Sequence, residues 1–133
     1  LFSREECDFL VDMAERVADR NYQAAEREAA AIVVSGTTHT ALNDTLQGFL
    51  QEPRGWQKRR HQSYPTTDLN VMTDPFTKSD RAWIKRKLDA RLAPTISRLF
   101  GVPQGALRAD DIFVVRYDGD RQASLNRHTD TGD

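Results

Sequence analysis

The first apolar stripe in the chain has the spacing of an amphipathic helix. Ser3-Arg-Glu-Glu6 is an S-x-x-E capping box, which marks a helix start. The pattern predicts a helix from about Ser3 to Arg20, and the Ala- and Glu-rich residues up to Ala31 allow it to continue. The apolar positions recur at i, i+3, i+4 and i+7; they are Leu10, Met13, Ala14 and Val17.

A second helical stripe runs from a cap at Thr77 or Ser79 to Phe100. Pro94 lies inside it and is expected to kink or restart the helix, because proline removes a backbone hydrogen bond. Gly101 is expected to end the helix. A shorter helix is predicted at about 42–50.

Three segments have the composition of β-strands. Ile32 to Gly36 is a short β-like run, and residues from Thr67 to Met72 favour a second strand. Ile112 to Tyr117 is apolar on both faces, which predicts a strand covered on both sides. The turn at 118–120 then leads to an extended segment that ends in His128-Thr-Asp130.

The chain has 133 residues, of which 38% are hydrophobic and 29% are charged. This composition is typical of a globular protein. We expect one partial domain over 1–133, helix-rich over 1–106, with the first core strands over 107–133. The net charge is −1, which offers no overall attraction to nucleic acid, and no stretch is long and apolar enough for a membrane span. The start at Leu1 and the end at Asp133 suggest a piece of a longer protein, so the compartment stays open.

The candidate chemistry lies at His128 and Asp130. Side chains alternate along a strand, so these two point to the same face. An imidazole and a carboxylate are two of the three ligands in the facial triad of non-haem Fe(II) oxygenases. The same triplet also occurs by chance in surface strands. Its position after a buried strand and a turn favours a metal role here.

Other candidate residues have simpler explanations. Tyr117 is equally compatible with a ligand contact and with a core tyrosine whose hydroxyl lies at the rim. His39 and His61 have no carboxylate two residues later, and both are expected to be exposed or capping histidines. Cys7 is expected to be a small core residue. It is the only cysteine in the sequence, so an internal disulfide is not possible. Asp118 and Asp120 are expected to be turn residues.

Together these motifs resemble the first half of the catalytic domain of prolyl 4-hydroxylase-like 2-oxoglutarate/Fe(II) dioxygenases. The main likeness is Phe113-Val-Val-Arg-Tyr117 followed by His128-Thr-Asp130. Supporting likeness comes from His61-x-x-Tyr64-Pro-Thr-Thr-Asp68, from the helix before the last strand and from the N-terminal helix. The likeness is weakest between Asn21 and Gly55.

The resemblance implies an α+β fold with a double-stranded β-helix (jelly-roll) core, incomplete here, and helices packed on one sheet. It implies Fe(II) ligation by His128 and Asp130, and contact between Tyr117 and 2-oxoglutarate. The implied reaction consumes O2 and 2-oxoglutarate, gives succinate, and hydroxylates a peptidyl residue such as proline, with ascorbate keeping the iron ferrous. The implied partner is therefore a peptide or protein substrate.

The family's second histidine and the basic residue that anchors 2-oxoglutarate have no counterpart within residues 1–133. We therefore expect these residues alone to be inactive and marginally stable. Two other functions remain open. One is a non-catalytic jelly-roll module that binds a protein through its helices and the 56–64 segment. The other is nucleic-acid binding through Lys58-Arg59-Arg60 beside Trp56 and Tyr64, which the neutral net charge disfavours.

Overall fold

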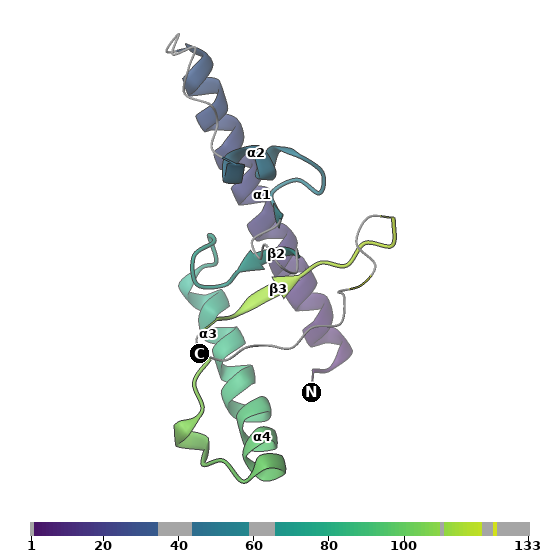
Figure 1. The fold of residues 1–133 in the computed structure, drawn as a ribbon, viewed down its shortest axis with the longest axis vertical. Helices are drawn as coiled ribbons and strands as arrows, with labels where there is room; N and C mark the ends of the chain where they lie inside the picture. Colours follow the sequence, from purple (N-terminus) through teal and green to yellow (C-terminus); the bar gives the residue numbers. More distant parts are fainter. Residues whose placement is uncertain (1, 35–43, 59–65, 110, 121–123, 125–133) are drawn as a thin grey trace.

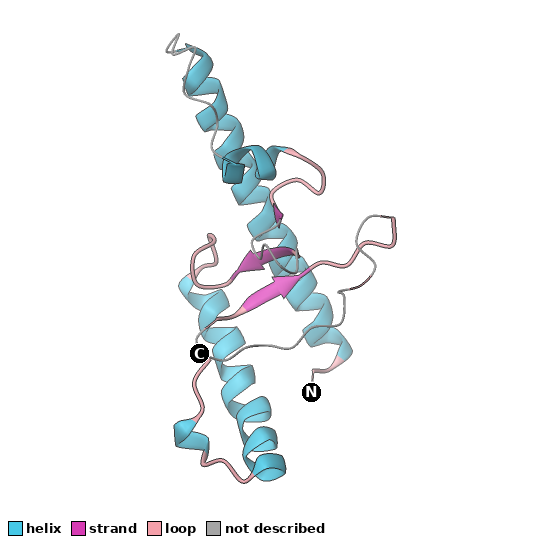
Figure 2. Cartoon of the chain, in the orientation of Figure 1, coloured by secondary structure: helices cyan, strands magenta, loops and turns pink. Residues whose placement is uncertain are grey.

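The computed structural model shows an α+β chain, and it describes residues 2–34, 44–58, 66–109, 111–120 and 124 (Figure 1). Within these ranges a long N-terminal helix and a helical rod flank a small antiparallel sheet (Figure 2). The α+β class expected from the sequence is confirmed. The elements in chain order are α1 (Arg4–Val34), α2 (Asp44–Leu50), β1 (Gln57–Lys58), β2 (Thr67–Asn70), α3 (Lys78–Lys87), η1 (Leu88–Leu92), α4 (Ala93–Phe100), η2 (Gln104–Ala106) and β3 (Phe113–Val115).

Helix α1 begins with the capping box expected from the sequence. The Glu6 amide donates to the Ser3 hydroxyl at 3.2 Å, and the Ser3 amide donates to the Glu6 carboxylate at 2.8 Å. The helix then continues to Val34, so the prediction of a β-like run from Ile32 is wrong for Ile32–Val34. Extending an existing helix adds one hydrogen bond per residue, and this gain outweighs the β preference of three branched residues.

The core forms where α1 meets one face of the sheet. Helix α1 contributes four buried side chains, β2 contributes Leu69, and α3 contributes Ile84. Burial of each large apolar side chain contributes about 1.5–3 kcal/mol. Cys7 does not join this core: it is exposed, contrary to the expectation, although it lies seven residues before Ala14 on the same face of α1 as the buried stripe. The core cluster therefore does not extend over this first turn of α1. The buried residues of α1 are Met13, Ala14, Val17, Ala18 and Ala25, with Asn21 the polar member of the stripe.

The sheet has the order β1-β2-β3, and both neighbouring pairs are antiparallel. Leu69 on β2 lies opposite Val114 on β3, and Val114 packs against the core. This pair defines the helix-covered face of the sheet. Strand β2 ends at Asn70, two residues earlier than predicted, because the Asn70 side chain accepts the amides of Met72 and Thr73 in a tight turn.

Helix α3, segment η1 and helix α4 form one rod from residue 78 to residue 100 (Figure 1). Thr77 is the cap, in a reciprocal capping box with Asp80. Segment η1 is a π-helical turn directly before Pro94, in which the Ala93 amide bonds to the Leu88 carbonyl. Pro94 has no amide hydrogen, and the wider turn makes room for its ring. The rod ends at Gly101 in the left-handed conformation, as predicted.

The strand β3 is shorter and more exposed than the sequence predicted. It covers Phe113–Val115, and the short helix η2 (Gln104–Ala106) precedes it in the chain. Phe113 keeps 38% of its surface exposed and Tyr117 keeps 52%. The expected cover on both sides is therefore incorrect within the described residues. Among the described residues, the core cluster that the helices build lies against the face that carries Val114.

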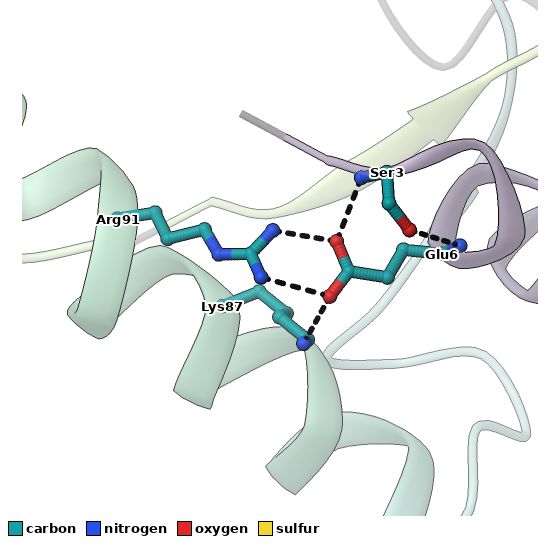
Figure 3. Close-up of polar contacts among 4 residues, drawn as sticks. All are labelled: Ser3, Glu6, Lys87 and Arg91. Carbon is teal, nitrogen blue, oxygen red and sulfur yellow. Dashed lines mark hydrogen bonds and ion pairs between the residues drawn. The ribbon is translucent and has the colours of Figure 1, made fainter.

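A cluster of charges ties the start of α1 to the rod (Figure 3). Arg91 makes two hydrogen bonds to the Glu6 carboxylate, at 2.5 and 3.0 Å. The Lys87 ammonium also donates to this carboxylate. The hydrogen bond from Lys87, that from the Ser3 amide and those from Arg91 hold the pKa of Glu6 down, at about 2. The three groups thus stabilise the ionised form of Glu6.

The link between α2 and β1 lies directly against α1 at Gly55. Gly55 has φ of 75°, and a Cβ there would lie 1.8 Å from the Ala18 carbonyl oxygen. We predict that Gly55→Ala lowers the free energy of unfolding more than Gly101→Ala does. Both positions carry the left-handed strain of about 1–2 kcal/mol, and Gly55 adds a backbone collision that costs about 1–3 kcal/mol more.

Urea denaturation of the two variants measures the difference, with Gly105→Ala as the control because a Cβ there meets no atom within 4 Å. Equal losses for Gly55→Ala and Gly101→Ala would contradict the close approach to Ala18.

The Glu6 cluster predicts a pH-dependent stability. The folded pKa of Glu6 is about 2, below its ordinary value of 4.5, so its contribution is complete above pH 4.5 and disappears as the pH falls toward 2. We predict that Glu6→Gln destabilises the chain at pH 7 and that the difference from wild type shrinks over this window. Urea denaturation across pH 2–7 measures it, with Glu28→Gln on the same helix as control. A constant difference across the range would be inconsistent with ionisation of Glu6 as the cause.

Candidate functional site

Tyr117 lies at the end of β3, on the face of the sheet opposite the helices. The Arg116 amide donates to the Thr67 carbonyl at 2.8 Å, which continues the β2–β3 ladder past Val115. Arg116 turns toward the helices, where its guanidinium bonds to Glu15 of α1 at 3.0 Å. By alternation, Tyr117 points to the other face with Val115. Its exposure leaves the phenol free to reach a ligand. This placement favours the ligand-contact role over the core-tyrosine alternative.

The same face carries a row of polar side chains from the other two strands. Gln57 on β1 lies opposite Asp68 on β2, and Asp68 lies opposite Val115 on β3. Directly opposed residues of an antiparallel pair share a face. The β2–β3 register continued by two residues past the Asp68–Val115 pair places Thr66 across from Tyr117. We call Gln57, Thr66, Asp68 and Tyr117 the polar sheet face.

Asp68 is the member of the polar sheet face whose importance the sequence did not indicate. It is completely buried, at 0% exposure, and the Thr66 hydroxyl donates to its carboxylate. Burial of a carboxylate is costly unless hydrogen bonds compensate. The one signal for it was an acid between β-formers in Thr67-Asp68-Leu69, inside the likeness that ends at Asp68. The buried Asp68 carboxylate accepts the hydrogen bond from Thr66 and thereby holds the Thr66 hydroxyl in a fixed position.

The basic segment near residue 58 begins in the core rather than at a binding surface. Trp56 is 3% exposed and belongs to the core cluster, with the Arg116 guanidinium 5.6 Å from its ring. The Lys58 ammonium donates to the carbonyls of Gly48 and Gln51. Neither side chain is available to stack on a base or bind a phosphate, so two of the features behind the nucleic-acid hypothesis are lost. Arg59, Arg60 and Tyr64 lie outside the described residues.

The predicted metal ligands His128 and Asp130 lie outside the described residues, as do His39 and His61. Within the ranges that the structure describes, no group of three or more His, Cys, Asp or Glu side chains is close enough to hold a metal ion. Asp118 and Asp120 form a turn, as expected, in which the Asp120 amide donates to the Asp118 carboxylate at 3.3 Å. The assignment of His128 and Asp130 remains a prediction.

Comparison with known proteins found no matching family model, no matching curated protein and no matching solved structure. Among the described helices, none has both the length and the apolar character needed to cross a membrane.

Proposed function

We propose that this chain is part of a 2-oxoglutarate- and Fe(II)-dependent dioxygenase that hydroxylates a peptidyl residue such as proline. The observation that carries the proposal is the order of residues along β3 and beyond: an exposed Tyr117 at the end of a paired strand, an acidic turn, and then His128-Thr-Asp130. The proposed fold extends the observed α+β arrangement with a jelly-roll core, to which β1, β2 and β3 would contribute their sheet.

The donor set fits ferrous iron. An imidazole nitrogen and a carboxylate oxygen are the ligand types of the non-haem Fe(II) triad. Zinc and iron–sulfur sites typically use cysteine thiolates instead, and neither proposed ligand is a thiolate. Both must be deprotonated to bind, so His128 would act as the neutral imidazole and Asp130 as the carboxylate. The third ligand must come from a residue outside this pair.

When bound, iron with 2-oxoglutarate supplies oxidative decarboxylation and hydroxylation of an unactivated C–H bond, and ascorbate maintains the ferrous state. This chain's own residues would bind and orient. His128 and Asp130 would hold the metal, and Tyr117 would donate its phenolic hydrogen to a 2-oxoglutarate carboxylate. The buried Asp68 carboxylate and Thr66 hydroxyl would keep β2 fixed beside Tyr117 as positioning groups.

Two exposed aromatic side chains of the sheet support a macromolecular substrate. Phe113 and Tyr117 are both partly exposed on the face without helices. Aromatic side chains of this kind give contact area to a peptide at low entropic cost. We therefore propose a peptide or protein substrate, with O2 as co-substrate.

The test is turnover by the longest protein product of the gene that contains this chain. We expect succinate release from 2-oxoglutarate that depends on Fe(II), and a loss of at least about a hundredfold in His128→Ala and in Asp130→Ala because each removes a metal ligand. Tyr117→Phe removes one hydrogen bond to 2-oxoglutarate, so the KM for 2-oxoglutarate should rise about tenfold.

His39→Ala is the matched control, because it deletes an imidazole that has no carboxylate two residues later. Its turnover should equal that of the wild type. If His128→Ala binds iron and turns over 2-oxoglutarate like His39→Ala, the metal assignment is wrong. The non-catalytic binding module would then be the better explanation.

A further inference from the structure

A cavity of about 540 Å³ lies between the helical rod and the segment that leads into β3. One wall is made by α3 and η1, and the other by residues 107–109 and Ile112. In Figure 1 the chain returns alongside the rod between η2 and β3, which creates this second wall. The volume is within the range of about 300–1,000 Å³ typical of small-molecule sites.

The floor and sides of the cavity are largely apolar. Val71 is buried below it, while Leu88, Leu107 and Ile112 are only partly buried and line it. Ile112 and Leu88 also pack against the core cluster, so the apolar wall has a rigid support. An aliphatic group placed here would lose water-exposed area without requiring the core to move.

The rim carries an excess of positive charge. Three cations line the cavity, Arg81, Lys85 and Arg108, against one carboxylate, Asp89. Lys85 pairs with Asp89 at 2.5 Å, so this charge is compensated.

The two arginines are bound only to neutral carbonyl groups. One Arg81 terminal nitrogen donates to the Asp74 carbonyl at 3.1 Å, and its buried Nε has no hydrogen-bond partner. Arg108 donates to the carbonyls of Gly105 and Leu107 at 2.8 and 3.0 Å. No carboxylate of the described residues forms an ion pair with either guanidinium. Their charges are therefore left for a ligand to neutralise.

We propose that this cavity binds a small amphipathic anion, in which a carboxylate meets Arg81 and Arg108 and an aliphatic body lies on Leu88, Leu107 and Ile112. Guanidinium groups favour carboxylates through paired N–H donors. Tyr117 and the other residues of the polar sheet face do not line the cavity. The inference therefore stands whether or not the chain belongs to a dioxygenase.

The test uses octanoate as the probe and amide chemical shifts of the isotopically labelled chain as the readout. We expect saturable binding with a dissociation constant of roughly 1 mM or tighter. The shift changes should be concentrated at residues 81–89 and 107–112. Octylamine has the same aliphatic body and the opposite charge, and it should bind at least about tenfold more weakly.

Two variants test the charged rim of the cavity and its interior volume separately. Arg108→Gln should weaken octanoate at least about tenfold, because Arg108 is exposed and bonds only to nearby carbonyls. Ala109→Trp should abolish binding by filling the cavity. Arg98→Gln is the matched control on α4, since Arg98 does not line the cavity. Absence of saturation, equal binding of octylamine, or an unchanged affinity in Arg108→Gln would each overturn the proposal. So would shift changes centred on the Tyr117 face.

Discussion

The apolar contact between α1 and one face of the sheet determines on which face Asp68 and Tyr117 lie. Met13 and Val17 of α1 are fully buried, and Leu69 of β2 meets them in the same core cluster. Because strand side chains alternate, a helix on the Leu69 face turns Asp68 to the opposite face. The β2–β3 register then places Val115 and Tyr117 on that face too. A slip of one residue would exchange the two faces and bury Tyr117 under α1.

The local elements were predictable where short-range chemistry decides them. The capping boxes at Ser3 and Thr77, the break at Pro94 and the end at Gly101 all follow from hydrogen bonds within a few residues. The end of α1 was not predictable in this way, since Ile32–Val34 favour strands in isolation and were absorbed by helix propagation. Whether Ile32–Val34 form a helix or a strand depends on the helical turns of α1 that precede them.

Tertiary features of the site were less accessible from the sequence. The apolar pattern of 112–117 correctly indicated a strand, but it did not show that helices cover only one face. The buried state of Asp68 depends on partners on other strands, and the cavity at Arg81 depends on the return of the chain beside the rod. Burial of Trp56 likewise could not be predicted from the basic residues beside it in the sequence.

Two kinds of chemistry are proposed for different residues of the chain. Tyr117 of the polar sheet face is proposed to contact 2-oxoglutarate, with His128 and Asp130 as metal ligands, whereas the cationic cavity beside α3 is proposed to bind an anion. The central claim is that the first metal ligands are His128 and Asp130. Titration of the labelled longest protein product of the gene with paramagnetic Mn(II), a stand-in for Fe(II) at nitrogen and oxygen ligands, tests it most directly. The account predicts that the amide signals of residues 127–131 broaden first, that the signal of Tyr117 broadens next, and that His128→Ala abolishes the effect. Broadening that begins at acidic residues of α1, or that survives His128→Ala unchanged, would contradict it.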